Sequence, residues 1–380
     1  MQSDHTEIYL PWEEYNTYKK NGGTFAPIGI VIKNDRIVLT NDYTGGIPIG
    51  SEILSINGIN SDVILHELKT SLSENRIESW FGNLLWRKYH MEPPFHIVFQ
   101  YESRVDTVAT PGLTENELRQ KQNELKSEQP KNDKFQYRRL NDFTGLLTIK
   151  SFGGPAKAYD HFLKQSFAQI IESGITNLII DIRDNDGGWT VNVSKLIHYI
   201  WDKPYLVASE FERKRSVQND KRLAHIVPWF LSPMLRIHSV MKDYYKTPMG
   251  ELATTTFDPT LPMSNNLRFH GDVYLLIGPF TYSSAHECAY IIKDNHIGTL
   301  IGQETGGRKP GSDAYEFVLP HSTLWARSAT GFSVRPNGEI CAHGVYPDIE
   351  VVPTIEDLNK HADTVLEFTL KHIEMRRETR

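Results

Sequence analysis

The sequence is poor in cysteine and carries no excess of basic residues. Only Cys288 and Cys341 occur among the 380 residues. They lie far apart and lack the spacing of a zinc site; a fold could pair them, but two separate buried thiols are the simpler expectation. With a formal net charge of −6 and no tract dense in lysine or arginine, the chain offers no field that would attract nucleic acid. We expect no metal, no other cofactor and no nucleic-acid partner.

Membrane and secretion signals are also missing. No apolar run approaches the roughly 20 residues that cross a bilayer, so we expect no transmembrane segment. Residues 1–5 (MQSDH) lack the basic start and apolar stretch of a signal peptide, which taken as it stands indicates a cytoplasmic protein. The start in a charged segment is equally consistent with a truncated chain whose leader lies upstream.

The pattern of the chain changes near residue 140, and its length suits about two domains. Residues 114–135 are rich in Glu, Lys, Gln and Asn, which marks an exposed linker or a solvated helix. Short strands and turns precede this stretch. After it, strands alternate with helical periodicities, which predicts βαβ units on a largely parallel sheet.

One turn and strand stand out in the first part. In residues 50–58 (GSEILSING), Gly50 suits a tight turn and Asn57-Gly58 a type I′ hairpin turn. The stretch resembles PDZ domains, which bind C-terminal peptides by adding them as a strand to a sheet edge. The alternative is a small β-barrel with a structural role only.

The second part contains a strand that ends in hydroxylated residues. Residues 278–287 (GPFTYSSAHE) follow an apolar strand and precede a helical run. A hydroxyl placed there lies at a helix N-terminus, where free N–H groups can hold a developing oxyanion. The alternative is that Ser283 or Ser284 caps the helix and Glu287 completes a capping box.

A glycine turn follows another strand of the same part. Residues 177–183 (NLIIDIR) run into residues 184–189 (DNDGGW), whose paired glycines expose backbone N–H groups. Functional groups of parallel sheets collect at the C-terminal ends of the strands. We therefore expect the Gly-Gly turn and the serine turn to meet there.

Four motifs in this order resemble the tail-specific, or C-terminal processing, serine peptidases, a family that includes the tricorn core and the interphotoreceptor retinoid-binding modules. The resemblance covers about residues 143 to 370. The motifs are residues 180–188 (IDIRDNDGG), 281–287 (TYSSAHE), 302–307 (GQETGG) and 344–348 (GVYPD).

The resemblance implies an α/β fold, α+β overall: a crotonase-like ββα catalytic domain with a small PDZ-like domain upstream. Residues 1–24 would add a strand and a helix to the catalytic region, 25–112 would form the PDZ-like domain, 113–140 a polar linker and 141–380 the catalytic domain.

The resemblance also implies roles for single residues. The nucleophile precedes an acid by three positions, which assigns it to Ser284 and leaves capping to Ser283. The oxyanion donors map to Gly187 or Gly188 and to Ala285. His286 is expected to face away from Ser284, because residues two apart do not share a helix face.

Two residues are candidates for the general base. His5, in residues 3–6 (SDHT), resembles the histidine of the tricorn-like branch. Lys309 resembles the lysine of the processing branch, since 309 minus 284 is 25, although counting from Gly302 puts Arg308 in that place. We prefer His5, because a lysine must be desolvated to act as a base near neutral pH.

An acid is expected to orient the histidine. In the tricorn-like branch it is a glutamate, whose place here is taken by Cys341, and Glu339 is the nearest acid. Asp181 and Arg183 are expected to orient the Gly-Gly turn rather than to react.

The resemblance implies a serine endopeptidase that cleaves peptides or proteins near their C-termini through an acyl-enzyme on Ser284. The alternative is a binding module of the same fold that has lost catalysis, for a peptide or a lipophilic ligand. If the chain is truncated, the resemblance points to the bacterial periplasm or cell envelope.

Overall fold

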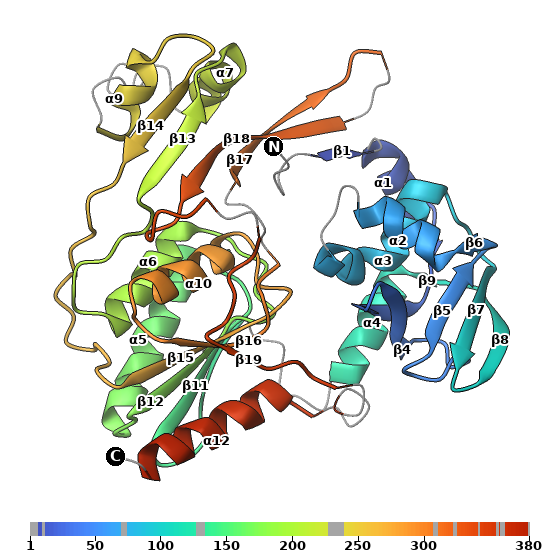
Figure 1. The fold of residues 1–380 in the computed structure, drawn as a ribbon, viewed down its shortest axis with the longest axis horizontal. Helices are drawn as coiled ribbons and strands as arrows, with labels where there is room; N and C mark the ends of the chain where they lie inside the picture. The colour runs from blue at the N-terminus through green and yellow to red at the C-terminus, as the bar shows by residue number, and fades with distance from the viewer. Residues whose placement is uncertain are drawn as a thin grey trace.

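The computed structural model is a mixed α/β protein whose described strands form four sheets (Figure 1). A blue-to-cyan N-terminal part lies beside a larger part that the rest of the chain builds. The prediction of an α/β chain is confirmed. The structure describes residues 7–9, 12–69, 74–126, 134–226, 239–306, 311–321, 325–340, 343–354, 357 and 362–378.

An antiparallel sheet with two helices forms most of the N-terminal part. Its elements are β3 (Ile28–Lys33), β4 (Arg36–Asp42), β5 (Glu52–Ile56), β6 (Ile59–Asn60), α2 (Ser61–Lys69), α3 (Glu74–Tyr89), β7 (Phe95–Tyr101) and β8 (Arg104–Thr110). The strand order is β3-β4-β5-β7-β8, and β6 pairs with β5. Asn57 and Gly58 join β5 to β6 with φ of 48° and 80°, the positive values that a type I′ turn requires, so the predicted hairpin is confirmed.

Smaller elements flank this sheet. They are α1 (Trp12–Lys20), β2 (Thr24–Phe25), β9 (Leu113–Thr114) and α4 (Glu115–Lys126), and β2 pairs with β9. Tyr18 of α1 stacks on Trp86 of α3 with ring centroids 4.5 Å apart, which ties α1 to α3. The polar stretch forms the solvated helix α4 over residues 115–126.

The larger part is built on a mainly parallel sheet. Its strands are β10 (Phe135–Arg139), β11 (Thr144–Ile149), β12 (Asn177–Asp181), β15 (Asp272–Ile277), β16 (Thr299–Gly302) and β19 (Ile349–Glu350). They follow one another in this order across the sheet, and all except β10 run parallel. The prediction of βαβ units on a parallel sheet is confirmed.

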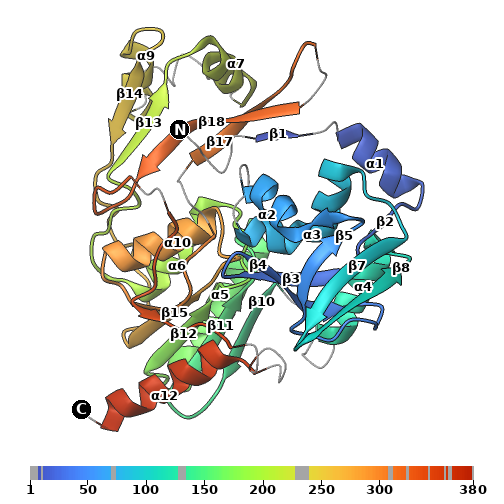
Figure 2. The ribbon, with the colours of Figure 1, turned by 45° about the vertical axis from the view of Figure 1, so that its right-hand side comes forward.

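Helices cover both faces of this sheet (Figures 1 and 2). They are α5 (Ala156–Glu172), α6 (Thr190–Ile200) and α10 (Ser284–Asp294) on one face and α12 (Thr364–Glu378) on the other. Successive side chains of a strand point to opposite faces. Leu178 and Ile180 accordingly lie in the core under α5, α6 and α10, and Ile179 lies in the core under α12.

A third large sheet joins segments from both ends of the chain. Its elements are β1 (Glu7–Tyr9), β13 (Glu210–Lys214), β14 (Leu252–Thr256), β17 (Gly311–Val318) and β18 (Trp325–Val334), with α7 (Val217–Ile226) and α9 (Ser239–Lys246) beside them. Glu7 of β1 pairs with Arg327 of β18, so a strand close to the N-terminus is added to a strand near the C-terminus.

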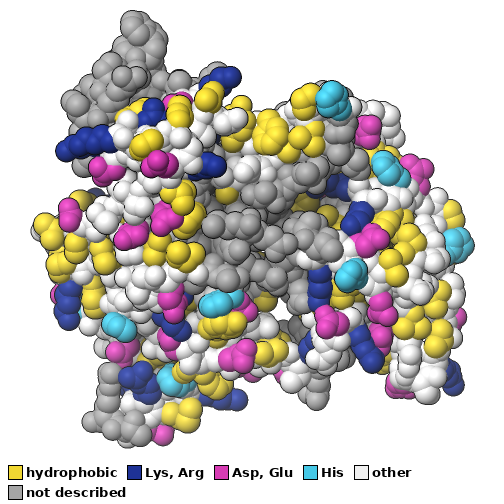
Figure 3. Space-filling model, turned by 45° about the horizontal axis from the view of Figure 1, so that its top comes forward, with side chains coloured by type: hydrophobic (Ala, Val, Ile, Leu, Met, Phe, Trp, Pro, Cys, Tyr) yellow, Lys and Arg dark blue, Asp and Glu magenta, His cyan; other side chains and the backbone are white. Residues whose placement is uncertain are grey.

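The distribution of charge on the surface and the length and polarity of the helices are those of an ordinary globular chain. On the face shown in Figure 3, acidic and basic side chains are interspersed, and neither sign dominates. Among the described residues, the helices are too short or too polar to cross a membrane. Cys288 is a buried free thiol, as expected, whereas Cys341 lies outside the described residues.

Candidate active site

The four sequence motifs meet at the C-terminal edge of the parallel sheet. The N–H of Tyr282 donates to the carbonyl of Asn185 at 2.9 Å, which joins the serine turn to the Gly-Gly turn. The N–H of Gly306 donates to the carbonyl of Thr281 at 3.1 Å, and that of Thr305 to the carbonyl of Val345 at 3.1 Å. The two turns are therefore in contact, as expected. The third motif contacts the serine turn through Gly306, and the fourth contacts the third through Val345.

The threonine of the serine turn fixes the path of the backbone. The Thr281 hydroxyl accepts from the N–H of Gly278 at 3.0 Å and donates to the carbonyl of Ile182 at 3.0 Å. Its side chain is fully buried, so both bonds are shielded from water. They hold the end of β15 against the end of β12.

The two serines occupy different environments. Ser284 begins α10, is 2% exposed, and its Oγ has no hydrogen-bond partner among the described residues. Ser283 is exposed and adopts φ 51° and ψ −124°, a conformation that non-glycine residues rarely hold. Such strain costs about 1–3 kcal/mol and clusters at active sites.

The capping predicted for these residues does not form. The Ser283 side chain makes no cap hydrogen bond, so that prediction is wrong. The Glu287 carboxylate accepts from the hydroxyl of Thr190, at the start of α6, at 2.6 Å. Glu287 therefore links two helices rather than closing a capping box.

Both glycines of the Gly-Gly turn are required by space as well as by conformation. Gly187 and Gly188 have φ of 107° and 140°. A Cβ on Gly187 would lie 2.6 Å from the Cβ of Ser283, and one on Gly188 would lie 2.1 Å from the backbone nitrogen of Gly153. The absence of side chains lets Gly187 lie directly against Ser283.

Two of the predicted oxyanion donors are already engaged. The N–H of Gly187 donates to Oδ1 of Asn185 at 2.9 Å, and the N–H of Ala285 donates to the carbonyl of Tyr282 at 3.0 Å. Neither N–H can point at a substrate without giving up its bond. The roles of Gly187 and Ala285 stay predictions.

The N–H groups of Gly188 and Ser284 are the alternative oxyanion donors. The bridge between Phe152 and Gly188 uses the carbonyl of Gly187 and the N–H of Trp189, which leaves the N–H of Gly188 outside it. Within the described residues, neither the N–H of Gly188 nor that of Ser284 has an acceptor. An oxyanion could therefore be held by one donor from each turn.

His286 is a buried residue of α10 whose ring contacts the third motif. Its Nδ1 lies 2.8 Å from Oγ1 of Thr305, which also accepts from the N–H of Val345 at 2.8 Å. Burial, with smaller contributions from Arg335 and His343, lowers the pKa of His286 from 6.5 to about 3. The ring is neutral at physiological pH and helps to join the second and fourth motifs.

The structure describes neither of the two candidates for the general base. His5 and Lys309 lie outside the described residues, as do Arg308 and Cys341. Glu339, the nearest acid to the expected orienting position, accepts from Nη1 of Arg335 and Nδ2 of Asn337, both at 3.1 Å. The choice of base stays a prediction.

Arg183 joins the end of β12 to the start of the C-terminal helix. It donates to both carboxylate oxygens of Asp181, at 2.7 Å and 2.9 Å, and to both of Asp363, at 2.6 Å and 2.9 Å. Asp363 precedes α12 and accepts from the N–H of Leu366. The expectation that Asp181 and Arg183 orient the Gly-Gly turn stays a prediction.

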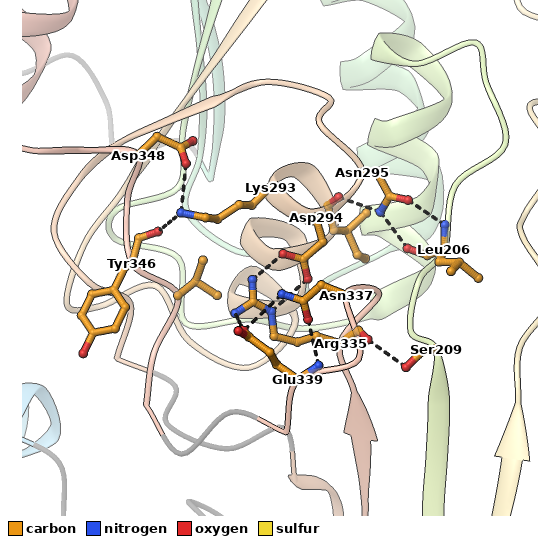
Figure 4. A network of polar contacts seen from close by, with 12 residues as sticks. Leu206, Ser209, Lys293, Asp294, Asn295, Arg335, Asn337, Glu339, Tyr346 and Asp348 are labelled. Atoms are coloured by element: carbon orange, nitrogen blue, oxygen red, sulfur yellow. Dashed lines mark hydrogen bonds and ion pairs between the residues drawn. The ribbon is translucent and has the colours of Figure 1, made fainter.

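The far end of α10 is anchored by ionic and polar contacts (Figure 4). Asp294 and Arg335 form an almost fully buried ion pair, in which Nε donates to Oδ2 at 2.9 Å and Nη2 to Oδ1. Lys293 donates to the carbonyl of Tyr346 at 2.8 Å and pairs with Asp348 at 2.9 Å. The helix that begins at the serines is thereby fixed at its other end.

Comparisons with known proteins agree with this geometry. The model of peptidase family S41 matches residues 143–351, more than half of the chain. This match defines a serine-type peptidase. The chain belongs to peptidase family S41.

Two solved structures of CPAF share the fold at low identity. Mature CPAF complexed with lactacystin has a TM-score of 0.66 at 14% identity, over 99% of this chain and 86% of that one. A CPAF mutant has a TM-score of 0.63 at 16% identity, over 94% and 82%. A putative peptidase from Parabacteroides merdae has a TM-score of 0.48 at 20% identity, over 66% and 67%. The comparison with curated protein sequences found no match.

Proposed function

We propose that this serine peptidase is an endopeptidase that forms an acyl-enzyme on a serine at the N-terminus of α10. The observation that carries the proposal is the contact of the Gly-Gly turn with the serine turn, where each contributes one N–H without an acceptor among the described residues. Such paired donors stabilise the oxyanion of acyl transfer.

We propose Ser283 as the nucleophile and keep Ser284 as the second candidate. The spacing to Glu287 favours Ser284. Exposure, strained backbone and contact with Gly187 favour Ser283, because a nucleophile must reach the substrate, and the Oγ of Ser284 is buried. With Ser283 as nucleophile, the N–H of Ser284, which has no acceptor among the described residues, is that of the following residue, which is an oxyanion donor in the nucleophile turn of α/β-hydrolases.

The steps follow from these positions. The serine Oγ attacks the carbonyl carbon while a base takes the hydroxyl proton, and the N–H groups of Gly188 and Ser284 hold the oxyanion. The amine leaves with the proton, and water then hydrolyses the ester. We propose His5 as the base, with Lys309 as the alternative.

We also propose the domain division that the family resemblance implies. Residues 141–380 form a crotonase-like catalytic domain, and residues 25–112 form a PDZ-like domain joined to it through residues 113–140. The pairing of β1 with β18 supports assigning residues 1–24 to the catalytic region. The antiparallel sheet with α2 and α3 supports the PDZ-like assignment.

A fluorophosphonate probe tests the nucleophile. We expect mass spectrometry to find the probe on Ser283, labelling to be lost in Ser283→Ala, and labelling to persist in Ser284→Ala. A label on Ser284 in the unmodified chain would transfer the role to that residue. No label at any pH, together with no peptide hydrolysis, would favour a binding module that has lost catalysis.

A further inference from the structure

Strand β3 is an edge strand of the N-terminal sheet, because it lies at the end of the order β3-β4-β5-β7-β8. An edge strand presents a row of backbone groups to which an extended peptide can be added. In a PDZ-like domain such an edge would hold the C-terminal tail of a substrate.

Helix α3 already covers this edge (Figure 2). Near the end of β3, the N–H of Ile32 donates to Oε1 of Glu78 at 2.6 Å. Just before its start, a Cβ on Gly82 of α3 would lie 2.8 Å from the carbonyl oxygen of Ala26. An added strand needs about 4.8 Å of separation from its neighbour and free N–H groups. Beside Ala26 the backbone of α3 lies too close for such a strand, and at Ile32 the Glu78 carboxylate already accepts the N–H that it would use.

The side chains fill the remaining space. Ile77, Phe81 and Leu85 of α3 are at most 2% exposed. They share one core with Ile30 and Ile32 of β3. The apolar positions that would take the side chains of a bound tail are occupied by the protein itself.

The opposite edge offers no substitute. In β8, Arg104, Val105 and Asp106 are all exposed. Charged side chains on an edge strand oppose the addition of a further strand.

We infer that α3 is the built-in occupant of the β3 edge, so that this peptidase selects extended internal segments of its substrates without capturing a free C-terminal carboxylate. The inference rests on the proposed endopeptidase function. It replaces the C-terminal preference that the sequence predicts with recognition by the catalytic part of the chain.

Matched peptide substrates of one sequence test this inference on the unmodified protein. One peptide ends in a free carboxylate and the other in an amide. We expect equal kcat/KM for both. Capture of the carboxylate by charge-assisted hydrogen bonds would instead favour the free acid by roughly 10- to 100-fold, and that result would overturn the inference. Cleavage of neither peptide, without fluorophosphonate labelling, would contradict the proposed function itself.

Hydrogen exchange supplies a readout that does not depend on activity. In the unmodified protein we expect the amide of Ile32 to be protected, and Glu78→Ala to increase its exchange rate. Arg104→Ala, on the opposite edge, should leave it unchanged. Exchange of the Ile32 amide at the rate of an open edge in the unmodified protein would show that α3 does not cover β3 and would overturn the inference.

Discussion

Gly187 lies against Ser283 so closely that a single methyl group cannot be placed between them: a Cβ on Gly187 would lie 2.6 Å from the Cβ of Ser283. The contact sets the position of the exposed serine relative to the N–H of Gly188. Because Gly187 follows β12 and Ser283 follows β15, the contact also depends on the pairing of these two strands.

Gly187→Ala should therefore displace the serine turn. We expect kcat/KM to fall by roughly 100-fold, as for a displacement of about 1 Å in an active site. Gly154→Ala is the matched control, because Gly154 also has a positive φ, 113°, but no atom within 4 Å of the added Cβ. Both variants carry the same type of backbone strain, so thermal unfolding separates that cost from the loss of activity. Equal activity in the two variants would contradict the contact's role.

The two serines should respond differently to alanine. Ser283→Ala should lower kcat by roughly four to six orders of magnitude, as for other serine nucleophiles. Ser284→Ala keeps its backbone N–H and removes a buried hydroxyl that has no partner among the described residues. It should retain activity and gain about 1 kcal/mol in the free energy of unfolding. Steady-state kinetics and urea unfolding measure both effects, and the reverse pattern would make Ser284 the nucleophile.

His286 should make stability depend on pH. Its pKa is about 3 in the folded protein, against 6.5 for an exposed histidine, so below pH 6.5 the unfolded chain binds a proton that the folded chain does not. The free energy of unfolding should therefore fall by about 1.4 kcal/mol for each pH unit between about 6 and about 3. His286→Gln should remove this part of the slope in urea unfolding curves. Identical slopes in the two proteins would exclude a neutral buried His286.

The buried ion pair at the end of α10 should be costly to break from one side. Arg335→Met leaves the Asp294 carboxylate buried and unpaired, which should cost about 3–5 kcal/mol of unfolding free energy. Combining it with Asp294→Leu should restore much of that loss. Arg36→Met is the control, because its pair with Glu52 is largely exposed and worth about 0–1 kcal/mol. A double variant as unstable as Arg335→Met would show that the pair itself, not the unpaired charge, decides the stability.

Local sequence patterns by themselves were sufficient to predict the parallel sheet, its turns and the family of this protein. Apolar strands separated by helical periodicities are sufficient to predict the parallel sheet, because each strand must bury side chains on both faces. The glycine pairs are sufficient to predict the tight turns, since only glycine adopts their positive φ at little cost. The order of the four motifs predicted the family. The meeting of the Gly-Gly turn and the serine turn followed from the common C-terminal edge of β12 and β15.

Only the tertiary structure shows which N–H groups of those motifs are already hydrogen-bonded and which serine is buried. The N–H of Gly187 donates to Asn185, the Oγ of Ser284 is buried, and Ser283 is an exposed residue. Motif spacing does not encode these differences, because each depends on a partner supplied by another strand end. The pairing of β1 with β18 and the covering of β3 by α3 are likewise contacts between segments distant in the chain, and only the packed structure shows that they exist.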